Sequence, residues 1–197
     1  MRIGIDIDGV ITDLNTFYLD YCSKYSMEKA KGELINPNAY ITLDMYDWGE
    51  KVDDEFWNKY MAIYSTECTP RRFVSEITKK LSDDGHEIYI ITARSYTTEN
   101  TQRGLKMRKT VIEWLKKHEI VYDKIVFSSY NKLENCRKNK IDIMIEDSER
   151  NINQLSEELT TICFDTRYNQ NVAGKNVIRC YSWYDIYDKI KNIQKMA

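Results

Sequence analysis

Short apolar runs alternate with helical stripes along most of this chain, and the alternation begins at about residue 71. The runs EIYIIT, KIVF and IDIMI are rich in isoleucine, which is typical of strands buried on both faces of a sheet. Between them, apolar residues recur three or four positions apart, as they do on one face of a helix. The predicted elements are a helix around 73–81 that ends at Gly85, a strand over 88–92, a helix over 101–117, a strand from 124, a helix over 132–138, a strand from 141, a helix over 149–159, strands at 160–165 and 177–180, and a last helix from 183. This order predicts right-handed βαβ units on a parallel sheet, and therefore an α/β fold.

The chain begins with another strand, MRIGIDIDG, which contains two acidic residues. Isoleucine occupies every second position from 3 to 7, with Asp6 between the last two and Asp8 directly after them. Side chains alternate faces along a strand, so both carboxylates are expected on the same side. The stretch fits either a solvated acidic edge strand or a site for metal or phosphate chemistry, and alone it does not choose between them.

Residues 14–70 do not follow the alternation and are predicted to form a helical insertion over one end of the sheet. Phe56, Tyr60 and Tyr64 recur every four residues, which predicts a helix over 53–66 with an acidic first turn. The domain prediction is therefore a core of residues 1–13 and 71–197, with 14–70 inserted after the first strand.

Polar residues lie at the carboxyl ends of three of the predicted strands, and ligands of open parallel sheets bind outside these ends. The set comprises Asp6, Asp8, Thr92, Glu146 and Asp147, with Lys132 at the start of a nearby helix. A solvated edge strand does not predict this convergence, which favours a functional site.

The donor types indicate the ligand. Carboxylate oxygens without histidine or cysteine suit Mg²⁺, which binds through a few carboxylates together with water and substrate phosphate. Thr92 and Lys132 can hold the other phosphate oxygens, with the lysine acting as a point charge. Lys138 and Lys140 are alternatives to Lys132.

These residues also carry a family resemblance. DIDGVITD resembles the first motif of the haloacid dehalogenase superfamily, DxDGxxxD; ITAR resembles the second motif, Lys132 the third, and IEDS the fourth. The order of the motifs and the helical insert are most similar to the 5′(3′)-deoxyribonucleotidase-like branch of these phosphatases. The resemblance implies a Rossmann-like core, a small helical cap formed by 14–70, and a Mg²⁺-dependent phosphomonoesterase.

The resemblance also implies roles for individual residues. Asp6 would be the nucleophile that forms an aspartyl-phosphate, and Asp8 the general acid and base. Mg²⁺ would take an oxygen of Asp6, the backbone carbonyl of Asp8 and Asp147, with Glu146 either on the metal or behind it. We expect Asp6 to be held ionised and Asp8 to carry a proton at the right moment, so their environments must separate their pKa values. Thr92, Lys132 and Arg94 are the predicted phosphate-binding residues.

The insertion is expected to choose the substrate. It holds 11 of the 24 aromatic residues, which suits stacking on a nucleobase but also the core of a small helical unit. The helical spacing of Phe56, Tyr60 and Tyr64 favours packing. Tyr40, Tyr46 and Trp48 lie outside any helical stripe and are candidates for contact with substrate. A (deoxy)nucleoside monophosphate is the predicted substrate, and a sugar phosphate or another small metabolite is the alternative.

Composition narrows the partners. The net charge is −2, and the insertion carries ten acidic and five basic side chains, so neither a nucleic-acid polymer nor an anionic membrane is an expected partner. The five scattered cysteines lack a CxxC pair, which fits reduced thiols, and the first residues resemble a strand rather than an export signal. These features predict a cytoplasmic protein.

His86 and His118 are predicted to lie on the surface near helix ends. A receiver-like signalling domain is a remote alternative, since receivers also gather acidic residues, Thr and Lys at strand ends.

Overall fold

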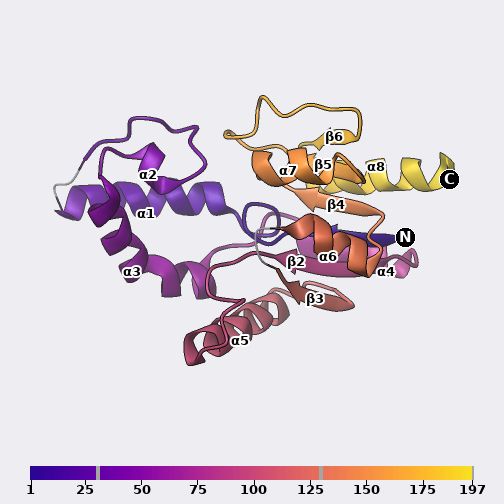
Figure 1. The fold of residues 1–197 in the computed structure, drawn as a ribbon, viewed down its shortest axis with the longest axis horizontal. Coiled ribbons are helices and arrows are strands. Elements are labelled where there is room, and N and C mark those ends of the chain that lie inside the picture. The colour runs from indigo at the N-terminus through magenta and orange to yellow at the C-terminus, as the bar shows by residue number, and fades with distance from the viewer. Residues whose placement is uncertain (30–31, 129–130, 197) are drawn as a thin grey trace.

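The computed structural model describes residues 1–29, 32–128 and 131–196, and its centre is a six-stranded sheet (Figure 1). The strands are β1 (Arg2–Ile5), β2 (Glu87–Thr92), β3 (Lys124–Phe127), β4 (Ile143–Glu146), β5 (Thr160–Phe164) and β6 (Val177–Cys180). They lie in the order β3-β2-β1-β4-β5-β6, and every neighbouring pair is parallel. The predicted α/β fold with a parallel sheet is confirmed.

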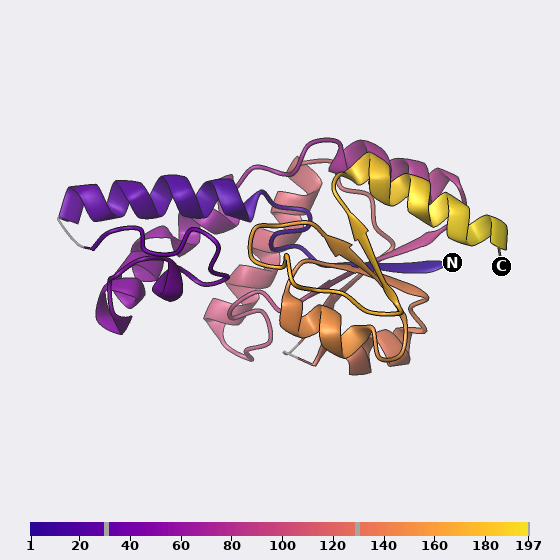
Figure 2. The ribbon, with the colours of Figure 1, turned by 90° about the horizontal axis from the view of Figure 1, so that it is seen from above.

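Helices cover both faces of this sheet (Figure 2). On one face lie α4 (Val74–Asp83), α5 (Gln102–Lys117) and α8 (Trp183–Met196); on the other lie α6 (Lys132–Asn139) and α7 (Glu149–Leu155). Two helix ends carry the residue types expected at such positions. Thr101 caps α5 by accepting a hydrogen bond from the amide of Gly104, and Gly85 follows α4 with a φ of 83°.

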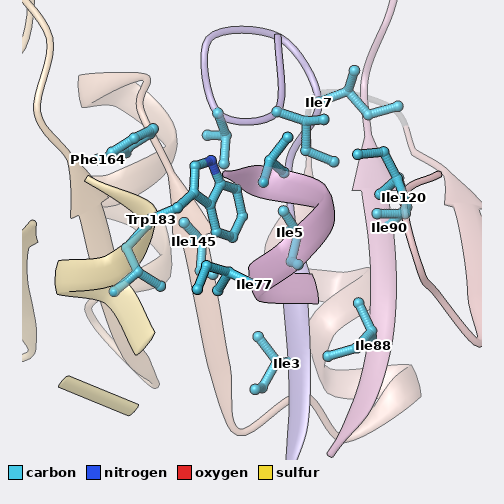
Figure 3. Packing of buried hydrophobic residues seen from close by; sticks show 14 of the residues in the cluster. Ile3, Ile5, Ile7, Ile77, Ile88, Ile90, Ile120, Ile145, Phe164 and Trp183 are labelled. Atoms are coloured by element: carbon cyan, nitrogen blue, oxygen red, sulfur yellow. The ribbon is translucent and has the colours of Figure 1, made fainter. Parts of the chain in front are cut away.

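The larger hydrophobic core lies under α4, α5 and α8, where alternate isoleucines of β1, β2 and β4 meet the helices. Figure 3 shows Trp183 of α8 in this layer, close to Ile145 and Ile77. Trp183 is only 1% exposed, and its ring lies 6.0 Å from that of Phe164, centroid to centroid. Complete burial of one isoleucine side chain contributes about 1.5–3 kcal/mol to folding. The isoleucines of this layer therefore supply much of the driving force for forming the sheet.

A second, aromatic-rich core belongs to α1 (Leu14–Lys29), α2 (Thr42–Met45) and α3 (Glu50–Glu67). Figure 2 shows these helices beyond the end of the sheet, on the side away from both termini. Phe56 is fully buried at their centre, and its ring contacts those of Tyr25, Trp48, Trp57 and Tyr60. The assignment of 14–70 as a separate cap domain stays a prediction.

Some local predictions are wrong. β1 ends at Ile5, so Asp6 and Asp8 follow the strand instead of lying in it. Phe73, the first residue of the helix predicted around 73–81, precedes α4 and is 50% exposed. His86 is not a surface residue: it is 4% exposed, because it lies beside the N-terminal strand, with its Nδ1 3.4 Å from the amino group of Met1.

Within the three described ranges, no helix combines the length and the apolar character needed to cross a membrane.

Candidate active site

The candidate site lies at the point where the strand order reverses direction. From β1 the chain runs outward through β2 and β3, then returns to β4 on the other side of β1. Loops that leave β1 and β4 therefore diverge and open a crevice at the carboxyl ends of these strands. The amide of Asp6 donates a 3.1 Å hydrogen bond to the carbonyl oxygen of Ile145, which fixes the loop after β1 beside Glu146 and Asp147.

Lys132 is a buried cation of this crevice. Its Nζ lies 2.6 Å from Oδ1 of Asp6 and 2.6 Å from Oε2 of Glu146, and its side chain is 2% exposed. Asn131 caps α6 through its side chain and so places Lys132 in the first turn. Of the alternatives, Lys138 pairs with Glu134 at 2.7 Å on the surface, and Lys140 forms the C-cap of α6.

Asp6 has an unusual protonation equilibrium in this environment. Burial, with smaller contributions from the neighbouring carboxylates, raises the pKa of Asp6 to about 7, although Lys132 opposes the shift. A divalent cation next to this carboxylate would favour the ionised form.

The two acidic residues of the fourth motif differ in their free oxygens. Glu146 accepts hydrogen bonds from the amides of Asp147 and Ser148 on Oε1, both at 3.1 Å, and its Oε2 receives Lys132. Asp147 binds the hydroxyl of Tyr168 through Oδ2, and among the described residues its buried Oδ1 has no hydrogen-bond partner. Glu146 is thus placed to hold the lysine, and Asp147 has an oxygen to spare.

The donor set fits a hard divalent cation. Asp6, Glu146 and Asp147 each bring a carboxylate oxygen into one group, with these atoms within 4.8 Å of one another. An unpaired oxygen on a buried carboxylate is costly unless a cation or a proton satisfies it. Accordingly, burial, followed by the charges of Glu146 and Asp6, raises the pKa of Asp147 well above its usual range.

Asp8 has different partners from Asp6. Arg94 donates to it from Nε, 3.0 Å from Oδ1, and also from Nη2, and Tyr64 of α3 donates its hydroxyl to the same carboxylate. Burial raises the pKa of Asp8, but the guanidinium of Arg94 outweighs it, and the net pKa lies below the usual range.

The pKa values of the two aspartates are thus shifted in opposite directions: that of Asp6 is raised and that of Asp8 is lowered. The ionisation of Asp6 against a metal and the proton that Asp8 carries during the reaction stay predictions. The physical reason is the distribution of cations. Lys132 is shared by two buried carboxylates, while Arg94 belongs to Asp8.

A cavity of about 620 Å³ adjoins these groups. The predicted site residues that line it are Asp6, Asp8, Lys132 and Tyr40, joined by Ala93, Tyr168 and residues of the loop and helix after β4. Thr92 is fully buried, and its hydroxyl accepts a hydrogen bond from the amide of Arg94 at 3.2 Å. Of the predicted insertion residues, Tyr40 is 46% exposed and contacts the cavity.

The structure does not bring Tyr46 and Trp48 to this cavity. Both are buried in the aromatic core of α1–α3, where their rings stack 4.7 Å apart. Tyr46 shares a 2.8 Å hydrogen bond with Ser23, and the indole of Trp48 donates to Ser26 at 2.8 Å. Their polar atoms are therefore satisfied within the insertion, which favours a packing role for both.

Two tyrosines of the site were not predicted to belong to it. The helical spacing of Tyr64 favours packing, and Tyr168 lies in the loop after β5, for which the sequence carries no motif. The position of Tyr168 beyond the carboxyl end of a strand was the signal that could have found it.

Comparison with known proteins agrees with the fold. A nucleotidase of Clostridium acetobutylicum is 29% identical over 194 residues, which cover 95% of this chain and 92% of that protein. A protein of Chlorobaculum tepidum with the provisional name 5′(3′)-deoxyribonucleotidase is also 29% identical, over 96% of this chain and 89% of its own. The solved structure of a predicted phosphatase from Clostridium acetobutylicum shares the fold, with a TM-score of 0.65 at 21% identity over 97% of this chain and 98% of that one.

The family of the chain, together with its fold, identifies it as a hydrolase of the haloacid dehalogenase type that acts on phosphoric monoesters. The family described as "5′ nucleotidase, deoxy (Pyrimidine), cytosolic type C protein" matches residues 1–196. The chain belongs to this family, which confirms the predicted nucleotidase branch and excludes the receiver-like alternative.

Proposed function

We propose that this hydrolase removes the phosphate of (deoxy)nucleoside monophosphates with Mg²⁺ and through a phosphorylated Asp6. The observation that carries the proposal is the buried group of Asp6, Lys132 and Asp147 at the reversal point of the sheet, of which Asp6 and Lys132 line a cavity of about 620 Å³. Asp6 and Asp147 would hold the metal, with Glu146 fixing Lys132 behind them. When bound, Mg²⁺ would neutralise charge on the phosphoryl oxygens.

The chemistry takes place in two displacements. A carboxylate oxygen of Asp6 bonds to phosphorus as the bond from phosphorus to the substrate oxygen breaks, and Asp8 gives that oxygen a proton. Asp8 then takes a proton from water, whose oxygen bonds to phosphorus and releases phosphate and free Asp6. Lys132 compensates the charge of the phosphoryl group, while most of the catalysis comes from positioning.

The ion pair between Arg94 and Asp8 bears on this proton transfer. Asp8 is ionised while Arg94 holds it, since the pKa lies below the usual range. Arg94 also has a buried Nη1 without a hydrogen-bond partner among the described residues. A phosphate oxygen would satisfy that donor and weaken the hold of Arg94 on Asp8, which favours proton uptake by the acid.

The aromatic surface of the cavity supports a nucleoside as leaving group. Tyr40 and Tyr168 both line the cavity, with ring centroids 5.1 Å apart. A planar base can lie against such rings. Residues 14–70 would then act as the cap that selects the substrate, in a protein that we place in the cytoplasm.

A phosphate-release screen over nucleotides and sugar phosphates tests the proposal. We expect hydrolysis of nucleoside monophosphates in Mg²⁺ and none in EDTA, because the buried carboxylates need a cation to bind an anionic substrate. Full activity in EDTA would contradict the metal requirement, and a clear preference for sugar phosphates would contradict the nucleotidase assignment.

The variant Asp8→Asn tests the proton transfer. We expect kcat to fall by about 10²–10⁴-fold on a nucleoside monophosphate, the usual effect of losing a general acid–base group. The loss of the phosphorylation rate should be much smaller with p-nitrophenyl phosphate, whose leaving group needs no proton. Rapid-quench measurement of the first turnover checks this, and equal losses on both substrates would refute the role of Asp8 as acid.

Tyr40→Ala and Trp48→Ala compare the cavity with the interior of the insertion. If a base rests on Tyr40, its loss costs about 1–3 kcal/mol in kcat/KM for the nucleotide, with little change for p-nitrophenyl phosphate. Trp48→Ala should instead lower the melting temperature and affect both substrates together, because the indole is 7% exposed inside the insertion. Selective loss of nucleotide activity in Trp48→Ala alone would reverse this assignment.

A further inference from the structure

The loop between β5 and β6 is attached to Asp147 at two points. The hydroxyl of Tyr168 donates to Oδ2 of Asp147, and the side-chain amide of Asn169 donates to the backbone carbonyl of Asp147 at 2.8 Å. Asn169 is fully buried and is fixed in turn by Arg179 of β6, whose Nη1 lies 3.0 Å from its Oδ1. The hydroxyl of Tyr168 is therefore carried by a well-anchored loop.

The contact between Tyr168 and Asp147 leaves no room for a side chain at Gly9. Gly9, in the loop after β1, lies so close that a Cβ there would be 2.0 Å from Oδ2 of Asp147 and 2.6 Å from the hydroxyl of Tyr168. Its φ of 80° is a further reason for glycine at this position. The backbone at Gly9 therefore packs directly against the contact between Tyr168 and Asp147.

The two carboxylate oxygens of Asp147 therefore differ in their hydrogen bonding. Oδ2 is occupied by Tyr168, whereas the buried Oδ1 has no partner among the described residues. Carboxylates that bind metals are commonly oriented by a hydrogen bond to their second oxygen.

We propose that Tyr168 is a positioning residue for the metal: its hydroxyl holds Oδ2 of Asp147 so that Oδ1 remains available to a divalent cation shared with Asp6. This inference rests on the proposed Mg²⁺-dependent function and adds a residue from outside the four motifs. Tyr168 acts through Asp147 and does not itself touch the cation.

Titration of metal-free protein with Mg²⁺ in a calorimeter tests this role without any substrate. The variant Tyr168→Phe keeps the ring that packs against Tyr40 and removes only the hydroxyl. We expect its Kd for Mg²⁺ to rise about 10–100-fold, the usual cost of losing a hydrogen bond to a metal ligand. At saturating Mg²⁺, kcat should return to within a few-fold of the wild-type value.

The matched control is Tyr181→Phe, which removes a hydroxyl from a side chain 70% exposed at the end of β6. Its Kd should equal that of the wild type. The Mg²⁺-induced rise in melting temperature provides a second measure, which remains usable if Tyr168→Phe is less stable, and this rise should shrink at a fixed Mg²⁺ concentration.

The outcomes separate the inference from the function on which it rests. An unchanged Kd in Tyr168→Phe, or a low kcat that saturating Mg²⁺ does not restore, would overturn the role of Tyr168 while leaving the phosphatase intact. A wild-type protein that hydrolyses nucleotides without binding Mg²⁺ would refute the metal assignment, and the inference with it.

Discussion

Replacement of Asp6 by Asn is expected to reduce hydrolysis by about 10⁴-fold or more, on every substrate. The amide is a poor nucleophile, and it removes a negative charge that Lys132 contacts at 2.6 Å. The neighbouring carboxylates have other partners: Asp8 is engaged by Arg94 and Glu146 by Lys132 and two amides, while Asp147 is held by Tyr168 and its free oxygen is the one that we assign to the metal. We therefore expect the substitution to slow the step in which Asp6 forms its bond to phosphorus.

Two measurements test this prediction. Acid-quenched wild-type protein should carry a phosphoryl group on Asp6 by mass spectrometry, and Asp6→Asn should not. Asp20→Asn, which neutralises an exposed carboxylate of α1, is the matched control and should retain wild-type activity. Ordinary turnover by Asp6→Asn would mean that the covalent mechanism is wrong.

Replacement of Lys132 by Met should abolish hydrolysis and lower the free energy of unfolding by about 3–5 kcal/mol, the usual cost of breaking a buried ion pair from one side. The carboxylates of Asp6 and Glu146 are nearly or fully buried, at 7% and 0% exposure, and would face each other without a cation. Urea unfolding in EDTA measures the loss. Lys138→Met is the control, because that lysine pairs with Glu134 at the surface and its loss should cost about 0–1 kcal/mol.

The pH dependence of this destabilisation follows from the same carboxylates. The pKa of Asp6 is already raised to about 7, and removal of Lys132 raises it further. The folded variant then binds protons more tightly than the unfolded chain, so its stability falls as pH increases. The deficit of Lys132→Met should be smaller at pH 5 than at pH 8. The double variant Lys132→Met/Glu146→Gln should recover part of the stability but no activity. If neither a lower pH nor Glu146→Gln reduces the loss in the free energy of unfolding, the cause is lost packing instead of the unpaired carboxylates.

Much of the core fold could be predicted because its signals are local. The isoleucines of β2 and β4 and the apolar stripe of α5 indicate the type of each element within a few residues, and the alternation of strands and helices indicates a parallel sheet. The order of the strands was not predicted. The helix α1 was not predicted individually, because its buried residues include Leu14, Tyr18 and Cys22 among polar neighbours, and its apolar stripe is weak.

The acidic residues of the site could be placed in one crevice because strand ends share an edge of the sheet. The partners of those residues could not be predicted. The pairing of Asp8 with Arg94 and Tyr64 joins residues 86 and 56 positions apart, and it depends on side-chain directions that no local pattern records. The burial of His86 likewise depends on Met1, which lies 85 positions away in the chain.

The two ends of the 14–70 segment leave the core side by side. Thr12 and Pro70 form an antiparallel bridge, and the amide of Asp13 donates to the carbonyl oxygen of Thr69 at 2.8 Å. A segment joined to the sheet through two adjacent crossings can change in length or sequence without shifting β1 or β2, so the substrate selection that we propose for it can diverge without disturbing the strands that carry the acidic site. Any swing of α1–α3 about these crossings would move Tyr64 relative to Asp8 and Tyr40 relative to Tyr168, so a single motion would be felt by both the proton-transfer group and the support of the metal ligand.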